Sequence, residues 1–354
     1  MTSIREVAER SGVSVSTVSR VFNGYDDVSQ ATRDRVLASA RELDYAPSAA
    51  ARTLVTQRSQ IVGVVLFTGD EHPDIHHPFF QGVLVGLKQG IGSLGYDLLL
   101  FATEQPGTER GREHSYLRRA RQHRVDGIVL MGVERDDPEV DKLVRSQVPV
   151  IGVDLDVAGT RTSHVTSDNV GGARLAVRHL HELGHTRIAT IAGPQNTKPG
   201  ADRLLGYRAE LRALGLQARL VYETEGDFYS DSGGVAMRRL LALREPPTAV
   251  FAASDMMAVG AIRAAQAAGL RIPDDLAVVG FDDSQLAELV DPPLTTIRQD
   301  TVGIGAAAGR ALVEQIENPD VTPPVLTLPV ELVVRASSGG AAQGGEGGTY
   351  TEVH

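Results

Sequence analysis

The chain has 354 residues, of which 42% are hydrophobic, so it is long enough for more than one domain with a sizeable core. It contains no cysteine, which excludes disulfides, thiolate metal sites and a cysteine nucleophile, and which fits a reducing cytoplasm. No apolar run reaches membrane-spanning length, and the first helix is amphipathic rather than a basic segment followed by an apolar signal region. We therefore expect a cytoplasmic protein without membrane contact.

The net charge of −10 is unevenly distributed. The first 60 residues carry eight arginines against seven acidic residues, a balance of +1, which leaves −11 for the remainder. An acidic body joined to a near-neutral head would suppress indiscriminate DNA binding and leave affinity to individual contacts and dimerisation. A negative body also keeps a protein soluble, and both interpretations can hold.

Residues 3–23 have the pattern of two short helices joined by a sharp turn. Ser3 and Glu6 have the spacing of a capping box, Gly12 allows the turn, and Ser14 is placed to cap the second helix. The apolar residues of the second helix, Val18, Val21 and Phe22, can pack against the first helix. Its outward face is small, hydroxylic and cationic, with Val15, Ser16, Ser19 and Arg20.

Such an outward face suits the major groove of DNA. An arginine such as Arg20 can pair bidentately with guanine O6 and N7, and hydroxyls can bond phosphates or base edges. A third helix follows, capped by Ser29 and with Val36, Leu37, Ala40 and Leu43 facing inward. Three such helices predict an independent helix-turn-helix headpiece over residues 1–46. The alternative is an ordinary helical hairpin in the core of a larger domain, which its position at the start of the chain disfavours.

Residues 47–60 have the pattern of a hinge and linker. Pro47 ends the third helix, and residues 48–54 are helix-prone but too short to form a stable helix alone. This segment would order when DNA and a second subunit supply packing, and Leu54 is the kind of apolar wedge that opens a minor-groove base step. A frayed interdomain linker is the alternative.

From residue 61 onward, buried strands alternate with helices. We predict strands at 61–67, 97–101, 127–131, 148–153, 188–192, 249–253 and 276–281. Helices end in glycine just before the next strand at Gly95, Gly184, Gly215 and Gly269, which predicts left-handed caps and βαβ units around parallel sheets. A stretch this long predicts two lobes with a cleft over residues 61–336, followed by a disordered Gly- and Ser-rich tail over 337–354. Ligands bind at the carboxyl ends of strands in such sheets.

The chain resembles the lactose-repressor family of bacterial transcription regulators over residues 2–336. The matching motifs are Val7-Ala8-x-x-Ser11-Gly12-Val13-Ser14-x-x-Thr17-Val18-Ser19-Arg20-Val21-x-Asn23, Val28-Ser29-x-x-Thr32-Arg33, Leu43-x-Tyr45-x-Pro47, Leu183-Gly184-His185, Ser254-Asp255-x-Met257-Ala258-x-Gly260, Val279-Gly280-Phe281-Asp282-Asp283 and Pro292-Pro293-Leu294-Thr295-Thr296-Ile297. The resemblance implies an all-α helix-turn-helix headpiece and an α/β two-lobed, periplasmic-binding-protein-like body with parallel sheets. It also implies a homodimer whose headpieces read palindromic operator DNA, with hinge helices in the minor groove.

The resemblance assigns DNA-contacting residues. Val15, Ser16 and Arg20 fall on base-reading positions. Ser14, Thr17, Asn23 and Ser29 fall near phosphate-contacting positions, and Leu54, with Ala51 beside it, falls on the minor-groove wedge. Asp27 departs from the family pattern at a loop position that relatives can use toward DNA. An acid there could accept a hydrogen bond from cytosine N4 or face solvent, and we favour solvent.

The resemblance also assigns residues that contact a small effector. Arg203 and Asp282 match polar clamps on ligand hydroxyls or carboxylates, and Phe228 matches an aromatic stacking position. The same alignment puts Asp154, Ser254, Asp255 and Gln299 near the cleft. Asp154, Ser254, Asp255 and Asp282 also sit at or just past strand ends, independently of the family. Helix capping is the alternative for these residues, above all for Ser254 and Asp255.

Residues 72–80, His-Pro-Asp-Ile-His-His-Pro-Phe-Phe, follow the first strand. The histidine spacing fits no defined metal site, and we expect no metal. The equivalent loop in the family faces the effector, which makes His76, His77 and Phe79 candidate ligand contacts. Gly303 and Gly305 imitate a dinucleotide fingerprint, but they lie inside an Ala-rich helix over 301–317, where small residues allow close helix packing. We expect no cofactor.

These features predict a transcription regulator, most simply a repressor of genes for sugar uptake or catabolism, controlled by a sugar bound between the lobes. No nucleophile elbow, Walker loop or marked catalytic triad is present, so we expect no enzymatic activity and no catalytic residues. A solute-binding protein of transport and an enzyme fused to a DNA-binding head are the alternatives. The carboxyl tail lacks leucine heptads, which favours a dimer over a tetramer.

Overall fold

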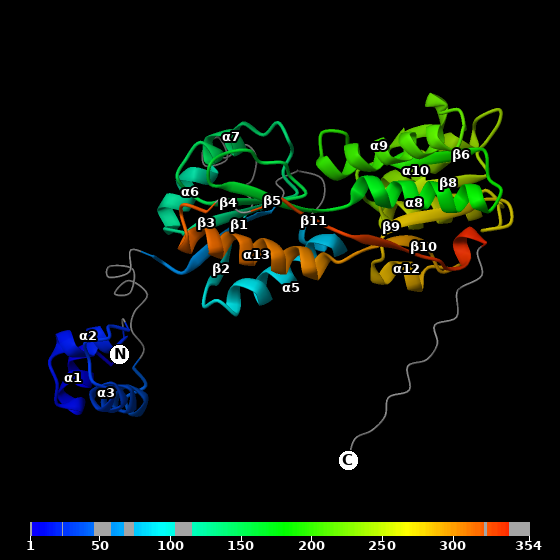
Figure 1. Cartoon of the computed structure of the whole chain (residues 1–354). Coiled ribbons are helices and arrows are strands. Elements are labelled where there is room, and N and C mark those ends of the chain that lie inside the picture. The colour runs from blue at the N-terminus through cyan, green and yellow to red at the C-terminus, as the bar shows by residue number, and fades with distance from the viewer. Residues whose placement is uncertain are drawn as a thin grey trace, which may run out of the picture.

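The computed structural model describes residues 2–22, 24–45, 58–66, 74–102, 115–321 and 324–339. Asn23, Ala51 and Leu54 lie outside the described residues, as do most of the predicted hinge and tail. Figure 1 shows the described parts coloured along the chain.

The headpiece consists of three helices, α1 (Ile4–Ser11), α2 (Val15–Phe22) and α3 (Gln30–Glu42). The capping box of Ser3 and Glu6 is formed, and Gly12 is left-handed with φ of 67°. The shared core consists of Val7, Ala8, Val18, Val21, Val36 and Ala40. Leu37 was expected to face inward but is 36% exposed, because Val36 and Ala40 occupy the inward stripe of α3.

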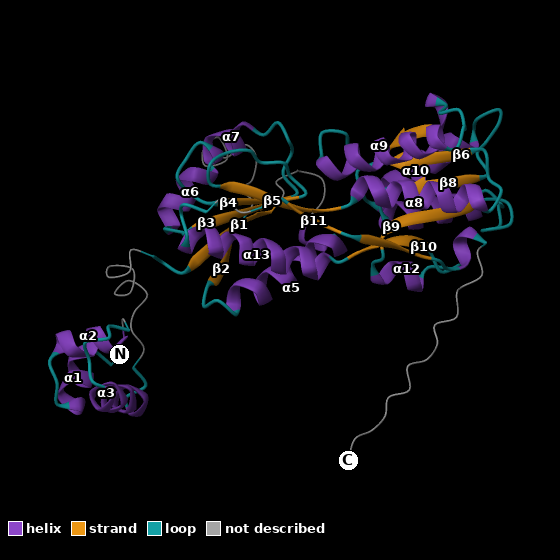
Figure 2. Ribbon diagram, viewed as in Figure 1, coloured by secondary structure: helices purple, strands orange, loops and turns teal. Residues whose placement is uncertain are grey.

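The body has two lobes, each built on a six-stranded sheet (Figure 2). The first sheet has the strand order β11-β5-β4-β3-β1-β2 and the second has the order β12-β10-β9-β8-β6-β7. Neighbouring strands run parallel except for β10 and β12, which are antiparallel. The predicted α/β fold with parallel sheets is confirmed.

The first lobe contains β1 (Ile61–Leu66), β2 (Asp97–Leu100), β3 (Gly127–Met131), β4 (Val150–Val153), β5 (Thr162–Ser167) and β11 (Leu326–Leu328). Its helices are η1 (Asp74–His76), α5 (Pro78–Gly92), α6 (Tyr116–His123), α7 (Pro138–Val144) and α13 (Thr301–Glu317). Helices α5 and α13 pack on one face of the sheet, and α6 and α7 pack on the other.

The second lobe contains β6 (Ile188–Ala192), β7 (Glu223–Glu225), β8 (Ala249–Ala252), β9 (Ala277–Asp282), β10 (Thr295–Gln299) and β12 (Val330–Val333). Its helices are α8 (Asn169–Glu182), α9 (Lys198–Ala213), η3 (Leu220–Tyr222), α10 (Ser230–Leu241), α11 (Asp255–Ala267), α12 (Gln285–Leu289) and η4 (Ala336–Ser338). Helices α8 and α9 cover one face of this sheet, and α10 and α11 cover the other.

The chain passes between the lobes after β5, after β10 and between β11 and β12 (Figure 1). The predicted helix caps at Gly95, Gly184, Gly215 and Gly269 all have left-handed φ, between 70° and 92°. Each cap lets a helix reverse into the next strand without strain on a Cβ atom. This pattern brings the carboxyl ends of the strands of each lobe to one edge of its sheet.

The carboxyl end of the body extends beyond the predicted boundary at residue 336. Ser337 and Ser338 are buried, and Ser337 Oγ donates to Val278 O at 2.6 Å and accepts from Thr295 N at 2.8 Å. Because these hydroxyls hold η4 against β9 and β10, Ser337 and Ser338 belong to the body. Among the described residues, no helix is both long enough and apolar enough to cross a membrane.

Candidate functional site

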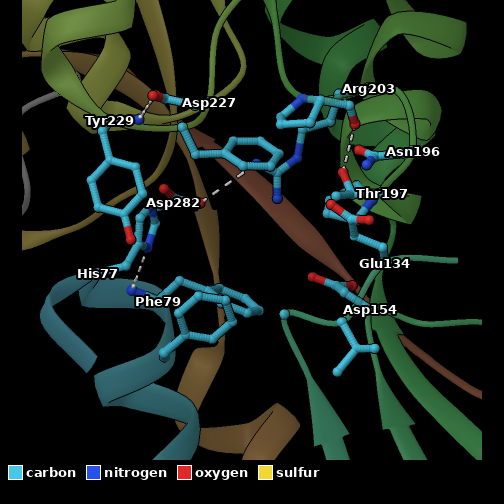
Figure 3. A pocket seen from close by; sticks show the side chains of 16 residues that line it. His77, Phe79, Glu134, Asp154, Asn196, Thr197, Arg203, Asp227, Tyr229 and Asp282 are labelled. Carbon is cyan, nitrogen blue, oxygen red and sulfur yellow. Dashed lines mark hydrogen bonds and ion pairs between the residues drawn. The ribbon is translucent and has the colours of Figure 1, made fainter. Parts of the chain in front are cut away.

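A cavity of about 330 Å³ lies between the lobes (Figure 3). The first lobe contributes residues from the start of α5 and from the carboxyl ends of β3 and β4, and the second contributes residues that follow β6 and β7 and that end β9. The lining residues are His77, Phe79, Phe80, Gly132, Val133, Glu134, Asp154, Pro194, Asn196, Thr197, Pro199, Arg203, Asp227, Phe228, Tyr229 and Asp282. This is the edge of the sheets at which α/β folds place their ligands.

Arg203 is the central cation of this cavity and is only 3% exposed. Its Nε donates to Asn169 Oδ1 at 2.8 Å and its Nη1 donates to Ala253 O at 2.5 Å. The guanidinium carbon lies 3.7 Å from the centroid of the Phe281 ring. These contacts fix the plane of the guanidinium, so its remaining N–H groups have a defined direction.

Two carboxylates accompany Arg203, the buried Asp282 and the half-buried Asp154. Asp282 Oδ1 is 3.7 Å from Arg203 Nη1 and accepts from Gln299 Nε2 at 2.7 Å. Burial raises the pKa of Asp282 to about 6, although the charge of Arg203 opposes this shift. Burial likewise raises the pKa of Asp154, against a hydrogen bond from Thr166. The cavity therefore presents both donors and acceptors to a ligand.

Three lining residues have the left-handed backbone that side chains disfavour: Asp154, Phe228 and Asp282 have φ of 51°, 73° and 127°. Non-glycine residues adopt such φ values at a cost of roughly 1–3 kcal/mol, and such strain gathers at functional sites. Here the strain lies at the ends of strands, where it turns each side chain toward the cavity.

Four aromatic side chains form an aromatic wall of the cavity, Phe79, Phe80, Phe228 and Tyr229, with His77 beside them, and the centroid of the Phe228 ring lies 5.8 Å from the guanidinium carbon of Arg203. His77 begins α5, and its Nδ1 accepts from Phe79 N at 3.3 Å, which leaves the proton on Nε2. Nε2 is buried and has no hydrogen bond of good geometry among the described residues. Burial, together with the charge of Arg203, lowers the pKa of His77 to about 4, although the nearby Phe228 backbone opposes the shift, so His77 is neutral near pH 7.

The structure brings six of the ten predicted effector residues into the lining: His77, Phe79, Asp154, Arg203, Phe228 and Asp282. The other four, His76, Ser254, Asp255 and Gln299, are not among the lining residues. His76 is exposed at the end of η1, and Gln299 lies behind Asp282 and donates to it.

Ser254 and Asp255 have structural roles and do not line the cavity. Ser254 is fully buried, caps α11 by accepting from Met257 N at 3.1 Å, and donates to Phe228 O. Asp255 accepts from Ser284 and from Thr296 Oγ1. These bonds hold the loop of Phe228 and the end of β9 in place, so both residues support the cavity from behind.

Several lining residues were missed by the sequence reasoning, among them Glu134, Asn196 and Thr197. Glu134 follows β3, and Asn196 and Thr197 follow β6. The signal was available, because both of these strands were predicted and residues just past strand ends are the ones that reach such a cavity.

The outward face of α2 is exposed, as predicted. Ser14 Oγ accepts from Thr17 N at 3.1 Å and lies within hydrogen-bonding distance of the hydroxyls of Ser16 and Thr17. Val15 is 42% exposed, and Ser29 caps α3 through Thr32 N. Asp27 is exposed, as expected, and it also pairs with Arg20: 2.7 Å separates Asp27 Oδ2 from Arg20 Nη1.

Fold and site together define a two-lobed ligand-binding protein that carries a helix-turn-helix head. Residues 3–48 match the model of bacterial regulatory proteins of the lacI family, and residues 177–338 match the periplasmic binding protein-like domain. The HTH-type transcriptional regulator CelR of Thermobifida fusca is 43% identical over 333 residues, which cover 94% of this chain and 96% of CelR. The ribose operon repressor of Escherichia coli K12 is 37% identical over 339 residues, which cover 96% of this chain and 100% of the repressor.

Solved structures of similar proteins point to the same family. A complex of CelR with cellobiose has a TM-score of 0.73 and 40% identity, and the match covers 95% of this chain and 100% of that one. The lac repressor dimer bound to operator and the anti-inducer ONPF has a TM-score of 0.80 and 30% identity, with coverage of 95% and 99%. The chain belongs to the lacI family of bacterial regulatory proteins. The predicted fold and the predicted class, a DNA-binding transcription regulator, are confirmed.

Proposed function

We propose that this regulator represses genes for the uptake or breakdown of a sugar and releases its operator when that sugar fills the cavity between the lobes. The observation that carries the proposal is the position of Arg203, Asp154 and Asp282 in a cavity lined by both lobes. A ligand that contacts both lobes stabilises one arrangement of the lobes relative to another. This shift between arrangements couples ligand binding to a distant site. Release fits a catabolic repressor, because the genes are needed only when their sugar is present.

A sugar suits the chemistry of the cavity. Its hydroxyls both donate to carboxylates and accept from a guanidinium, and the apolar face of its ring packs on aromatic side chains. The volume of about 330 Å³ lies within the range of roughly 300–1,000 Å³ typical of small-molecule sites. Cellobiose, the ligand of the CelR complex, is the first candidate, and ribose, suggested by the ribose operon repressor, is the second.

We assign individual roles to the lining residues. Arg203, Asp154 and Asp282 bond sugar hydroxyls, and Phe79 and Phe228 pack against the ring. His77 adds a neutral Nε2–H donor to a hydroxyl at the aromatic wall. Gln299, Ser254 and Asp255 act behind these residues, and His76 has no assigned contact.

We assign the headpiece to operator DNA. Val15, Ser16 and Arg20 read bases, while Ser14, Thr17 and Ser29 contact phosphates. Asn23, Ala51 and Leu54, which lie outside the described residues, keep their predicted roles at a phosphate and in the minor groove. The protein acts as a homodimer on a palindrome, in the cytoplasm, where bacterial operator DNA lies.

We propose that the protein catalyses no reaction and binds its sugar reversibly. Its relatives are transcription regulators, and the cavity residues already have roles in binding. The check is incubation of purified protein with the sugar that it binds: the sugar is expected to be recovered unchanged, and a hydrolysed or oxidised product would contradict this assignment.

The experiment that tests the function is selection of genomic DNA fragments by the purified full-length protein at about physiological ionic strength, where weak electrostatic binding is screened. We expect a short palindrome, located beside genes for sugar transport or breakdown. Isothermal titration calorimetry with cellobiose and ribose then identifies the effector. Absence of a common motif, both with and without pooled cell metabolites, would overturn the proposal.

A further inference from the structure

An ion pair lies on the exposed face of the headpiece, between Arg20 in the last turn of α2 and Asp27 in the loop before α3. Arg20 Nη1 donates to Asp27 Oδ2 at 2.7 Å, and the two side chains are 58% and 53% exposed. A pair this exposed adds little to folding stability, because water and salt screen it. Its effect becomes larger where binding removes the water, which for this face is the surface of DNA.

The loop that carries Asp27 is held in place independently of this pair. Arg33 on α3 donates through Nη2 to Tyr25 O at 2.8 Å and through Nη1 to Val21 O at 3.3 Å. Tyr25 N in turn donates to Arg20 O at 3.1 Å. These bonds attach the loop to both helices, so Asp27 has a defined position and the longer Arg20 side chain is the partner that is oriented.

We propose that Asp27 is a positioning residue for base selection, which holds the Arg20 guanidinium in the direction that reads guanine and weakens binding to DNA of other sequences. This inference rests on the proposed function, in which Arg20 reads a base. A guanidinium has five N–H donors in one plane, and Asp27 engages one of its nitrogens, so donors remain for guanine O6 and N7.

The carboxylate of Asp27 acts differently on the two kinds of complex. Beside a phosphate backbone it repels DNA of any sequence. In the specific complex two effects offset that repulsion. The Arg20–Asp27 ion pair becomes stronger as it loses water, and the Arg20 guanidinium is already oriented when it reaches guanine. Asp27 therefore lowers nonspecific affinity and increases the ratio of specific to nonspecific affinity.

The test uses the full-length protein, its selected operator and a scrambled duplex of equal length, with dissociation constants measured over a range of salt concentrations. Asp27→Asn is expected to bind scrambled DNA a few-fold more tightly, and its operator-to-scrambled ratio is expected to fall by about tenfold. Asp26→Asn is the matched control. It removes the same charge one residue away, and Asp26 is exposed and forms no ion pair with the described residues. This variant is expected to bind scrambled DNA more tightly with an unchanged ratio.

Arg20→Ala completes the cycle. Adding Asp27→Asn to Arg20→Ala is expected to cause no further loss of the ratio, because the carboxylate acts through the arginine. The inference is overturned if Asp27→Asn keeps the ratio while binding the operator more tightly, since Asp27 would then only compete with guanine for Arg20. It is also overturned if both aspartate variants lower the ratio equally. A wild-type protein that does not prefer the operator would instead overturn the proposed function itself.

Discussion

Arg203 illustrates how much one side chain determines in this cavity. Its Nε bond to Asn169 extends toward Asp154, because Asn169 Nδ2 donates to Asp154 Oδ1 at 3.5 Å and to Thr166 Oγ1 at 3.2 Å. The cation of one lobe and the carboxylate of the other are therefore joined through the amide of a single asparagine. A ligand that bonds to Arg203 and Asp154 acts on this link directly.

Arg203→Lys is expected to weaken effector binding by at least about tenfold, because lysine lacks the planar fork that bonds Asn169 and stacks on Phe281. Calorimetry with the identified sugar measures this loss. Arg208→Lys, on the same helix, is the control, because Arg208 is exposed and pairs with Glu223 outside the cavity. Equal sugar affinity in Arg203→Lys and the wild type would contradict the assigned role.

His77 predicts a pH dependence of folding stability. Its pKa is about 4 in the folded protein against 6.5 for the model imidazole, so the unfolded chain takes up a proton first as the pH falls. The stability of the wild type is therefore intact above pH 6.5 and falls below it, by about 2 kcal/mol at pH 5.

His77→Asn removes the titrating ring and keeps an acceptor that can cap α5. The free energy of unfolding, measured by urea denaturation of both proteins at pH 7.5 and pH 5, is expected to show the extra acid loss only in the wild type. Histidines elsewhere titrate in both proteins and cancel in the comparison. An identical pH dependence would show that the ring of His77 is not buried in the neutral form.

At the scale of elements, the packing of α5 against α13 explains the motif that imitates a dinucleotide fingerprint. A Cβ atom on Gly305 would lie 2.0 Å from Val83 O, and one on Gly86 would lie 1.9 Å from Val302 O. The two helices therefore touch through their backbones. Gly305 therefore serves helix packing, while Gly303 N donates to Asp300, the cap of α13.

Gly305→Ala is expected to destabilise the protein by roughly 1–3 kcal/mol, because a backbone carbonyl cannot move aside as a side chain can. Gly92→Ala is the matched control in the same helix pair. A Cβ atom there would meet nothing within 4 Å, so the variant is expected to gain up to about 1 kcal/mol from reduced chain entropy. Thermal and urea unfolding measure both effects, and a neutral Gly305→Ala would contradict the close packing.

The predicted hinge also belongs to this scale. Leu54→Ala is expected to weaken operator binding strongly and to leave binding to scrambled DNA unchanged, because nonspecific contacts are electrostatic and need no apolar wedge. Electrophoretic mobility shifts with the two duplexes measure the difference. An equal loss of affinity for the operator and for the scrambled duplex would place Leu54 outside the minor groove.

The apolar strands could be predicted from sequence, and the short or polar strands could not. β3 and β6 have apolar runs with both faces buried, and both were predicted to the residue. β7 is only Glu-Thr-Glu, and β5 reads Thr-Ser-His-Val-Thr-Ser, so neither has the apolar signal of a buried strand. The polar side chains of β5 are buried because they bond to neighbours, as Ser163 does to Pro324 O at 2.8 Å.

The cavity could be predicted in part for a related reason. Asp154 and Asp282 follow apolar strands, so strand ends and the family motif pointed to them together. Ser254 and Asp255 follow β8 in the same way, yet Ser254 caps the helix that starts there and Asp255 accepts hydrogen bonds from Ser284 and Thr296. A polar residue just past a strand is therefore a candidate for ligand binding. It binds a ligand only where its side chain is not already used to cap the next helix or to bond a neighbouring loop.

At the scale of the whole molecule, the lobes are linked by contacts beside the cavity. Asp156 follows β4, and its Oδ1 lies 3.2 Å from Nζ of Lys198 at the start of α9. Nearby, Arg135 N donates to Asn196 O at 3.1 Å. Burial raises the pKa of Asp156, but hydrogen bonds from Lys198 and from the Arg135 side chain, with the charge of Lys198, outweigh burial and lower this pKa. Lys198 also pairs with Asp202. Thr197 and Pro199, the neighbours of Lys198, line the cavity, so a bound sugar acts next to the contact between lobes.

The measurement that tests the account most directly is the affinity of the full-length protein for its selected operator, with and without the sugar found by calorimetry. Fluorescence anisotropy of labelled operator is expected to show affinity weakened by roughly 5- to 150-fold at saturating sugar, the range of an ordinary allosteric coupling. Arg203→Lys is expected to bind the operator with normal affinity, and this affinity is expected to stay unchanged at that sugar concentration. A wild-type protein that binds the sugar in the cavity and keeps its operator affinity unchanged would contradict the control of the headpiece by this cavity.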